Sequence, residues 1–439
     1  MRDDIQTFDA IVIGGGPGGS SAATYLRRAG RSVLLLEKEI FPRFHIGESL
    51  LPYNQSLLRE LGVLPDVLAA GFPRKTGAQF YLGNGAGSTQ FVFANGRFTR
   101  ETETVQVERS KFDHILLKHA RKEGADVREG WLVQNCVADA GGVSVKARDP
   151  EGRTHSFRSA FLVDASGRGN LTGNQEGLRE LHPRHRKVAI FGHFTGAHRD
   201  EGERGGDTVI VRMDNKWFWI IPISAEKTSV GLVIDKDEFA AFGKSTEAVF
   251  QHWVDVSPPL ATRMAHAQRV GPLQTTSDFS YCNRKLAADR VLRVGDAAGF
   301  MDPIFSAGVF LAMWSGKLAA EVVAKSVAGG HNGARLLAGY ERRVRKAIKF
   351  YWRLVEQYYT QPFMELFLQP RNHHDLPAAV NAVLAGELEP GWSVRWRLEY
   401  FFLLVKLQKR WPVVPHLSFS QEQPGPAPQP APQPMAGKA

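Results

Sequence analysis

The sequence predicts an α/β fold with an α+β insert, in which a parallel sheet is interleaved with an antiparallel sheet and a helical C-terminal region follows. Three observations predict this fold. A strand, a glycine-rich turn, a helix and a second strand occupy residues 8–37. Runs of aromatic and β-branched residues separated by glycine occupy 71–100 and 187–233, and residues beyond about 330 are helical, aromatic and basic. The 439 residues, 43% of them hydrophobic, suffice for two or three domains with full cores.

The βαβ unit at the start of the chain follows from its hydrophobic pattern. Residues 8–13 form a strand-like run, the glycine-rich turn 14–19 follows at once, and residues 20–28 have helical spacing. Gly30 is placed to end that helix. The apolar run 32–37 is short and bounded by a turn signal, which predicts a buried parallel strand.

The later segments are predicted to alternate between the two sheets. Strands are expected at 160–164 and 289–295 in the first sheet, and helices at 109–124 and 307–324. We therefore predict a discontinuous first domain of residues 1–70, 100–170 and 270–330. The other predicted units are a substrate-side β-sheet domain (71–99 and 171–269), a helical region (331–417) and a disordered Pro/Gln-rich tail (418–439).

Composition and charge exclude several classes of protein. Two cysteines, Cys136 and Cys282, are too few for a disulfide scaffold, so a cytoplasmic location is expected. Acidic residues at positions 3 and 4 predict no secretion signal, and charged residues interrupt the apolar windows, so no membrane span is expected. No His–Cys or His–Glu cluster with metal-ligand spacing is evident, so no metal site is expected. The formal charge of +10 leaves nucleic acid, a membrane surface, an acidic partner or anionic ligands open.

The glycine-rich turn is a candidate dinucleotide site. Gly14-x-Gly16-x-x-Gly19 lies between a strand and a helix, where it allows a tight turn and lets the backbone approach a pyrophosphate. The N-terminus of the helix supplies N–H donors and a positive dipole. Glu37 ends the second strand, where a carboxylate can accept hydrogen bonds from ribose hydroxyls, and an acid there disfavours a 2′-phosphate.

A second candidate site feature lies far downstream, at Gly295 and Asp296. A strand that ends in Gly-Asp before small residues places a carboxylate where it can bond the ribityl chain of FAD, which NAD lacks. Together with the N-terminal turn and Asp164-Ala165-Ser166-Gly167, this pattern resembles the Rossmann-like FAD-binding fold of aromatic hydroxylases and their relatives.

Within that superfamily, the segment from Phe41-Pro42-Arg43 to Gly47-Glu48-Ser49 resembles flavin-dependent halogenases and geranylgeranyl reductase-like enzymes. Val107-Glu108-Arg109 resembles the family position from which an arginine reaches FAD. Arg43 and Arg109 are fixed cations that can neutralise pyrophosphate and the charge of reduced flavin. The cofactor-binding residues that the resemblance implies are Gly14, Gly16, Gly18, Gly19, Glu37, Lys38, Arg43, Ser49, Arg109, Gly295 and Asp296.

Two further features are similar to halogenases in particular. Trp217-Phe218-Trp219-Ile220-Ile221-Pro222 matches the halogenase signature Trp-x-Trp-x-Ile-Pro at every fixed position. In the family this segment lines the space between flavin and substrate, which implies tunnel roles for Trp217, Trp219, Ile221 and Pro222. Lys75 resembles the family's lysine, which implies that it is the catalytic residue that delivers the halogen. The ordinary alternatives are core packing for the two alternate tryptophans and an exposed surface position for Lys75.

The loop before the long predicted helix resembles the family's halide site. In the family, backbone N–H groups of this loop bind the halide, which implies halide contacts for Gly308 and Val309. Family members often carry Ser or Thr before that glycine, whereas this chain has Ala307.

The resemblance, over residues 8–330, implies an FAD-dependent halogenase acting on an electron-rich aromatic or pyrrolic substrate. It implies FAD supplied as FADH2 by a separate flavin reductase, molecular oxygen, and chloride or bromide. The substrate is expected either free or bound to a carrier protein, and no nucleic acid partner is expected. An FAD-dependent monooxygenase or geranylgeranyl reductase-like enzyme is the alternative of another reaction class, and a non-enzymatic binding module is a third. The surplus cations at 342–349 and 395–410 favour an acidic partner, a carrier protein or the reductase.

Overall fold

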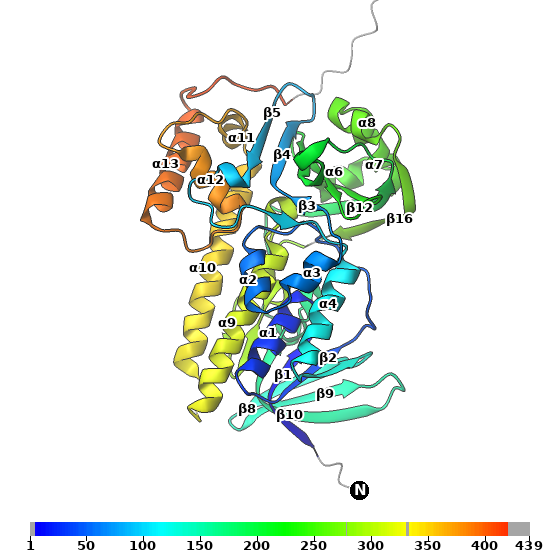
Figure 1. Ribbon diagram of the computed structural model, residues 1–439, viewed down its shortest axis with the longest axis vertical. Coiled ribbons are helices and arrows are strands. Elements are labelled where there is room, and N and C mark those ends of the chain that lie inside the picture. The colour runs from blue at the N-terminus through cyan, green and yellow to red at the C-terminus, as the bar shows by residue number, and fades with distance from the viewer. Residues whose placement is uncertain (1–4, 278, 331–332, 420–439) are drawn as a thin grey trace, which may run out of the picture.

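The computed structural model describes residues 5–277, 279–330 and 333–419. Figure 1 shows two tiers. The lower tier holds an eight-stranded sheet, and the upper tier holds a seven-stranded sheet and the last helices. The expectations for the first four residues lie outside the described residues, as does the predicted tail from residue 420 onward.

The lower sheet is the predicted parallel sheet. Its strand order is β18-β19-β10-β1-β2-β7, and the pairs β19–β10, β10–β1, β1–β2 and β2–β7 are parallel. A hairpin of β8 and β9, which the sequence did not predict, joins the edge of β10. The strands are β1 (Gln6–Ile13), β2 (Val33–Glu37), β7 (Asp126–Glu129), β8 (Leu132–Asp139), β9 (Gly142–Arg148), β10 (Thr154–Asp164), β18 (Ala287–Ala288) and β19 (Val291–Arg293).

Helices α1 (Pro17–Arg28), α4 (Arg109–Lys122) and α9 (Gly308–Ala328) lie in this tier (Figure 1). The close approach of α1 and α9 depends on glycine. A Cβ on Gly316 would lie 2.5 Å from the backbone oxygen of Gly18. The predicted helix at 307–324 is confirmed as α9, and its residues Ala312 and Gly316 pack against Gly18 at the start of α1.

The upper sheet has the order β16-β12-β15-β14-β13-β4-β5. All neighbours are antiparallel except β13 and β4, which are parallel, because the chain passes through the lower tier between them. The expectation of a purely antiparallel sheet is therefore corrected at this one pair. The strands are β4 (Gly77–Leu82), β5 (Ser88–Val92), β12 (Lys187–Thr195), β13 (Thr208–Arg212), β14 (Trp217–Pro222), β15 (Thr228–Asp235) and β16 (Gln268–Ser277).

Strand β16 extends past the boundary at residue 269 that we predicted for this sheet, because its residues up to Ser277 pair with β12. The division into domains itself stays a prediction. A three-stranded sheet joins β11 (Arg179–Leu181), β17 (Tyr281–Asn283) and β20 (Gly299–Phe300), and β3 (Arg74–Lys75) pairs with β6 (Thr104–Val105).

The helices α10 to α13 complete the fold. The helix α10 (Ala334–Tyr358) lies beside α9 and leads from the lower tier to α11 (Gln361–Leu368), α12 (Leu376–Leu384) and α13 (Trp392–Gln408) in the upper tier (Figure 1). The remaining helices are α2 (Asn54–Glu60), α3 (Leu64–Ala69), α5 (Leu171–Gln175), α6 (Lys236–Ala241), α7 (Thr246–Asp255) and α8 (Pro258–Met264). Over the part of the chain that the structure describes, no helix combines the length and hydropathy that a membrane crossing needs.

Candidate active site

A cavity of about 540 Å³ lies where the carboxyl ends of the parallel strands, β14 and the start of α9 meet. It collects residues that are far apart in the sequence. The predicted site residues in its wall are Gly14, Gly16, Gly18, Glu37, Lys38, Arg43, Ser49, Arg109, Trp217, Trp219, Ile221, Gly295, Asp296, Gly308 and Val309. Gly19, Lys75 and Pro222 lie outside the wall, and each is accounted for below.

The glycine-rich turn has the geometry that a dinucleotide requires. Gly14 has a φ of +96°, and a Cβ on it would lie 2.4 Å from the backbone oxygen of Ala165. A Cβ on Gly19 would lie 1.9 Å from the backbone oxygen of Gly14, so Gly19 acts through packing and not through the cavity. Helix α1 begins at Pro17, inside the glycine-rich segment 14–19 and three residues earlier than predicted, and its N-terminal dipole points to the cavity.

Glu37 is buried at the end of β2, as the sequence predicted. Its Oε2 accepts a hydrogen bond of 2.6 Å from the backbone N–H of Gly15, and its Oε1 accepts one of 2.8 Å from that of Glu39. These bonds hold the carboxylate at the wall, where a ribose hydroxyl can reach it. Lys38, by contrast, is exposed at the rim of the cavity, with its Nζ 3.9 Å from Glu39.

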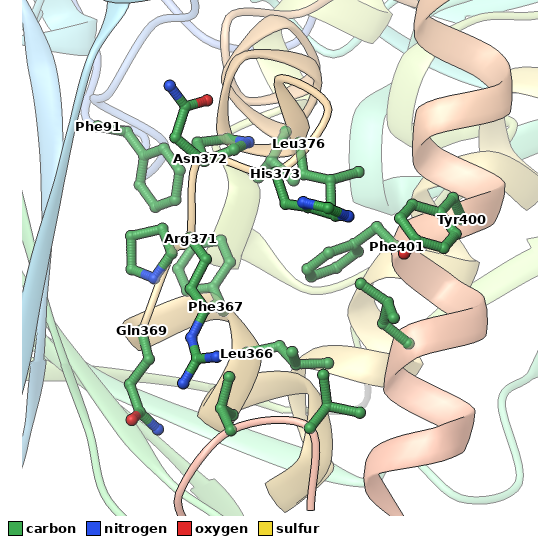
Figure 2. A pocket seen from close by; sticks show the side chains of 16 residues that line it. Phe91, Leu366, Phe367, Gln369, Arg371, Asn372, His373, Leu376, Tyr400 and Phe401 are labelled. Carbon is green, nitrogen blue, oxygen red and sulfur yellow. The ribbon is translucent and has the colours of Figure 1, made fainter.

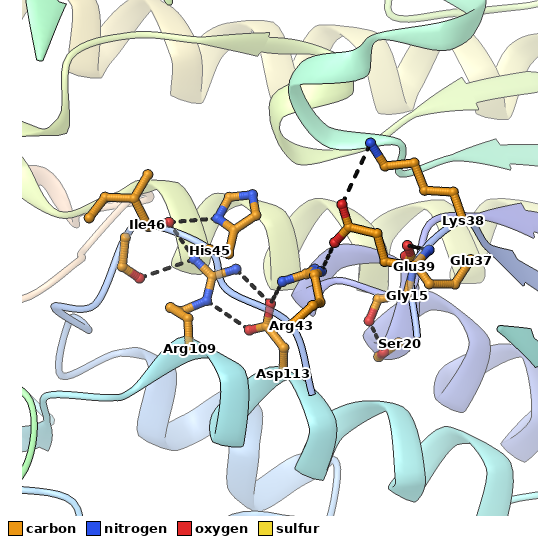
Figure 3. A network of polar contacts seen from close by, with 11 residues as sticks. Gly15, Ser20, Glu37, Lys38, Glu39, Arg43, His45, Ile46, Arg109 and Asp113 are labelled. Atoms are coloured by element: carbon orange, nitrogen blue, oxygen red, sulfur yellow. Dashed lines mark hydrogen bonds and ion pairs between the residues drawn. The ribbon is translucent and has the colours of Figure 1, made fainter. Parts of the chain in front are cut away.

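The two predicted flavin arginines share one buried carboxylate, that of Asp113, which the sequence did not identify. Arg109 donates to it through Nε at 2.7 Å and Nη2 at 2.9 Å, and Arg43 donates through Nη1 at 2.9 Å (Figure 3). The two guanidinium groups hold the pKa of Asp113 below its usual range, against the effect of burial. Both guanidinium groups line the cavity, where they can donate to an anionic ligand, and Arg43 also lies 3.2 Å from the carboxylate of Glu39.

Asp296 faces the same cavity from the turn after β19. Burial raises its pKa to about 6, although the charges of Arg168 and Arg109 oppose this shift. Gly295, with a φ of +55°, has no room for a side chain, since a Cβ would lie 2.8 Å from the Cβ of Ala312. The glycine-rich turn, the buried acid Glu37, the two arginines and the Gly-Asp turn converge on one cavity, and this set of donors and acceptors fits FAD.

Alternate residues of β14 face opposite sides of the upper sheet. Trp217, Trp219 and Ile221 face the cavity, whereas Phe218 and Ile220 pack in the other core of the sheet. Pro222 is buried at the end of the strand, outside the cavity wall.

The tryptophans are fixed by hydrogen bonds. The Nε1 of Trp217 donates to the hydroxyl of Tyr359 at 2.8 Å, and this hydroxyl donates to Oδ2 of Asp302 at 2.7 Å. The Nε1 of Trp219 donates to Oγ of Ser229 at 3.1 Å. Tyr359 therefore connects the aromatic C-terminal region to the cavity wall, a contact that sequence spacing did not reveal.

Lys75 lies behind the cavity wall and is 2% exposed. Its Nζ donates to Oγ of Ser49 at 2.8 Å and to the backbone oxygen of Leu50 at 3.0 Å. Burial lowers the pKa of Lys75 to about 7, while the charge of Asp207 raises it. The alternative of an ordinary surface lysine is therefore wrong for this structure. Ser49, predicted to contact the cofactor, lines the cavity and also holds this lysine.

The start of α9 faces the cavity with its backbone. Gly308 is the first residue of the helix, Val309 the second, and both line the cavity. Ala307 precedes them, and its methyl side chain cannot accept from their N–H groups. The positive end of the α9 dipole is therefore available to an anion in the cavity.

Glu48 and His193 form a pair beside the cavity that the sequence did not predict. The Oε1 of Glu48 lies 2.6 Å from Nε2 of His193, and the side chain of Glu48 is 1% exposed. Among the described residues, its buried Oε2 has no hydrogen-bond partner. This oxygen is a further acceptor available in the cavity wall, to which Glu48 belongs.

A second cavity, of about 470 Å³, lies among the C-terminal helices. Figure 2 shows Phe91 of β5 on one side and Tyr400 and Phe401 of α13 on the other. Among the aromatic residues of the C-terminal region, Tyr359 bonds Trp217 in the wall of the first cavity, whereas Tyr358 is buried in helix packing and Trp392 is 79% exposed.

These features define an FAD-binding flavoprotein, and comparison with known proteins bears this out. The model of the family described as "FAD binding domain" matches residues 7–357. The 1H-pyrrole-2-carbonyl-[peptidyl-carrier protein] chlorinase of Pseudomonas fluorescens is 32% identical over 375 residues, covering 80% of this chain and 83% of that protein. The corresponding brominase of Pseudoalteromonas luteoviolacea is 36% identical over 333 residues, covering 74% and 79%.

Solved structures agree with these relatives. The flavin-dependent brominase Bmp2 superposes with a TM-score of 0.83 at 31% identity, covering 92% of this chain and all of that chain. The myxobacterial chondrochloren halogenase CndH, an FAD-dependent halogenase, superposes with a TM-score of 0.75 at 34% identity, covering 80% and 82%. The chain belongs to the flavin-dependent halogenase family of enzymes.

Proposed function

We propose that this enzyme transfers an electrophilic halogen through Lys75 to an electron-rich aromatic or pyrrolic substrate. The observation that carries this proposal is the position of Lys75. It is a buried amine with a pKa of about 7, directly behind the wall of the cavity that the FAD residues and β14 form. Only one side chain, Ser49, separates its Nζ from that cavity along the hydrogen bond between them.

Reduced FAD, when bound, would supply the hypohalous acid that the reaction consumes, together with molecular oxygen and a halide. This chain's residues hold the reactants. Arg43, Arg109 and the α1 N-terminus bind the negative charges of the cofactor, and Gly308 and Val309 present backbone N–H groups to the halide. The tryptophans of β14 keep the substrate apart from the cofactor, and their hydrogen bonds keep the partition rigid.

The chemistry at Lys75 requires its neutral amine. Nζ attacks the halogen of hypohalous acid, an N–X bond forms, and the O–X bond breaks; the displaced hydroxide takes a proton from the nitrogen and leaves as water. The arene then attacks the halogen, the N–X bond breaks, and the ring loses its proton. A pKa of about 7 makes roughly half of the lysine neutral at neutral pH, whereas an exposed lysine is almost fully charged.

A variant series tests this role. Lys75→Met keeps the length of the side chain but removes the amine, and we expect halogenated product to fall by about 100-fold or more. Hypohalous acid should still form, and a halogen-trapping reagent should detect it. The assay contains FAD, a flavin reductase, NADH and chloride or bromide with a panel of phenols and pyrroles, read by mass spectrometry. The exposed Lys146→Met, on β9 and outside the basic stripe of α10, is the matched control.

Full halogenation by Lys75→Met would contradict the delivery role. Product that forms without any halide, as an oxygenated or a reduced substrate, would instead support the monooxygenase or the geranylgeranyl reductase-like alternative.

We further propose that the substrate reaches the enzyme on an acidic carrier protein. The carrier-protein substrates named for the two relatives support this, as does a basic stripe on α10. Arg342, Lys346 and Lys349 are exposed at helical spacing, whereas Arg343 pairs with Glu389 at 3.3 Å. Carrier proteins are acidic, and complementary charge speeds their encounter with the enzyme.

Charge reversal tests the carrier surface. The double variant Arg342→Glu with Lys346→Glu should lower kcat/KM for a carrier-bound pyrrole by about tenfold, and leave the same pyrrole as a small thioester unaffected. The control reverses two exposed cations of β9, Lys146→Glu with Arg148→Glu. Equal activity of both double variants on every substrate form, with unchanged coupling to the reductase, would refute the proposed surface.

A further inference from the structure

A cluster of metal-ligating side chains lies outside the proposed active site. His182 and His185 belong to the loop between β11 and β12, and Glu356 belongs to α10. One ligand atom from each of the three residues lies within 4.8 Å of the other two. The sequence alone did not predict this site, because its third member is supplied by a helix from another part of the chain.

The distances suit a small cation. The Nε2 of His182 lies 3.5 Å from Oε1 of Glu356. Two ligands of a tetrahedral zinc ion, each about 2.1 Å from the metal, are about 3.4 Å apart. The pair therefore needs little movement to share a metal, and the third ligand atom has to approach by less than 1.5 Å or so, which a side-chain rotation provides.

His185 gives the second, independent observation. Its ring is 9% exposed, and its Nδ1 has no hydrogen-bond partner among the described residues. A buried nitrogen without a partner is disfavoured unless something satisfies it, and a metal ion is one partner that can. His182 and His185 have ring centroids 4.7 Å apart, and both lie against Trp352, which limits their freedom to rotate away.

We infer that His182, His185 and Glu356 form a binding site for a divalent transition metal of the zinc class. Two imidazoles and one carboxylate are the donor set that such borderline ions prefer over calcium or magnesium. Three protein ligands leave a coordination position for water, and the half-exposed Glu356 gives the ion a route from solvent.

The present contacts of Arg184 compete with the metal. Its guanidinium lies 3.1 Å from Oε1 of Glu356, but the side chain is 79% exposed and can turn into solvent at little cost. Its backbone N–H makes a long contact of 3.4 Å with Nδ1 of His182, which is lost when that nitrogen carries the proton of a metal-bound ring.

An ion at this site would join the loop before β12 to α10 and act on the cavity wall. The ring of His185 lies 5.5 Å from that of Tyr359, whose hydroxyl bonds both Trp217 and Asp302. Metal binding would therefore restrict the helix end that supports the tryptophan of β14.

The experiment uses the full chain, stripped with a chelator and titrated with Zn²⁺ by calorimetry and with Co²⁺ by visible absorption. We expect one equivalent to bind, Co²⁺ to give ligand-field bands, and the melting temperature to rise with Zn²⁺. His182→Ala and Glu356→Gln should each weaken binding by more than about tenfold. Arg184→Ala should tighten it by up to about fivefold, because a competing ion pair is removed.

The control is the double variant His373→Ala with His374→Ala. It removes two exposed histidines near α12 that belong to no such cluster in the described part of the chain. This variant should bind one equivalent with unchanged affinity. Circular dichroism and FAD binding check that each variant is folded. If an alanine variant does not fold, the result for Glu356→Gln decides the test. No binding by the parent chain, or binding that His182→Ala and Glu356→Gln leave unchanged, would overturn the inference.

Discussion

Replacement of Lys75 by methionine is expected to change how the stability of the enzyme depends on pH. Lys75 has a pKa of about 7 in the folded chain against an ordinary value of 10.5, because burial disfavours its charged form. Between these two values the unfolded chain binds more protons than the folded chain, so stability rises with pH. Methionine has a similar length but does not titrate, and Lys75→Met therefore lacks this rise.

The magnitude follows from the two pKa values. One pKa unit corresponds to about 1.36 kcal/mol. Between about pH 7 and about pH 9 most of this interval is traversed, and after allowing for partial titration near pH 7 the gain is about 2 kcal/mol. Methionine also removes the hydrogen bonds to Ser49 and Leu50, but these contribute nearly the same amount at both pH values. The change in the free energy of unfolding between the two pH values therefore reports the titration of Lys75 alone.

The assay is urea unfolding of the parent chain and of Lys75→Met at both pH values, with FAD absent. From about pH 7 to about pH 9, the free energy of unfolding of the parent chain should rise by about 2 kcal/mol more than that of Lys75→Met. Lys349→Met, which removes an exposed lysine, should track the parent chain. If Lys75→Met and the parent chain change in parallel, Lys75 has an ordinary pKa, and the argument for a neutral halogen-accepting amine fails.

Three further outcomes are expected. Asp113→Asn leaves two guanidinium groups without their shared carboxylate, and should lower the free energy of unfolding by about 3–5 kcal/mol and weaken FAD binding, measured by urea unfolding and flavin fluorescence. Tyr359→Phe leaves the Nε1 of Trp217 and a carboxylate oxygen of Asp302 without their partner; we expect a loss of about 1–3 kcal/mol, and an unchanged melting curve would refute it. Gly19→Ala places a Cβ 1.9 Å from a backbone oxygen, so purified protein should lack flavin, and a yellow variant with normal affinity would contradict this geometry.

The features that the sequence predicted are those carried by local pattern. The βαβ unit, the acid at Glu37 and the alternation of β14 each depend on a short stretch of chain whose spacing fixes strand, turn or face. These stretches meet in one cavity because the carboxyl ends of parallel strands lie at one edge of a sheet. Local pattern therefore predicted the glycine-rich turn and the acid at Glu37, whereas the cofactor roles of Arg43, Ser49 and Arg109 rest on the family resemblance and stay predictions.

The features that were missed depend on contacts between distant segments. The parallel pairing of β4 with β13 and the contact of Tyr359 with Asp302 join parts of the chain whose proximity no single stretch encodes. Asp113 is different, because it lies four residues after Arg109 in a predicted helix, where such pairs face each other. That spacing was a usable signal for the shared carboxylate.

If Lys75 delivers the halogen as proposed, the arrangement of charge explains why its amine lies behind the cavity wall and not in it. An amine in the cavity would lie in the field of Arg43 and Arg109, and its charge would compete for the anions that those residues serve. Behind Ser49, Lys75 is desolvated enough to lose its proton near neutral pH, while Asp207 keeps its pKa from falling further. Separation of the two arginines from the amine would thus let one cavity hold anions while a neighbouring nitrogen stays nucleophilic, which is the condition that the proposed halogen transfer through Lys75 requires.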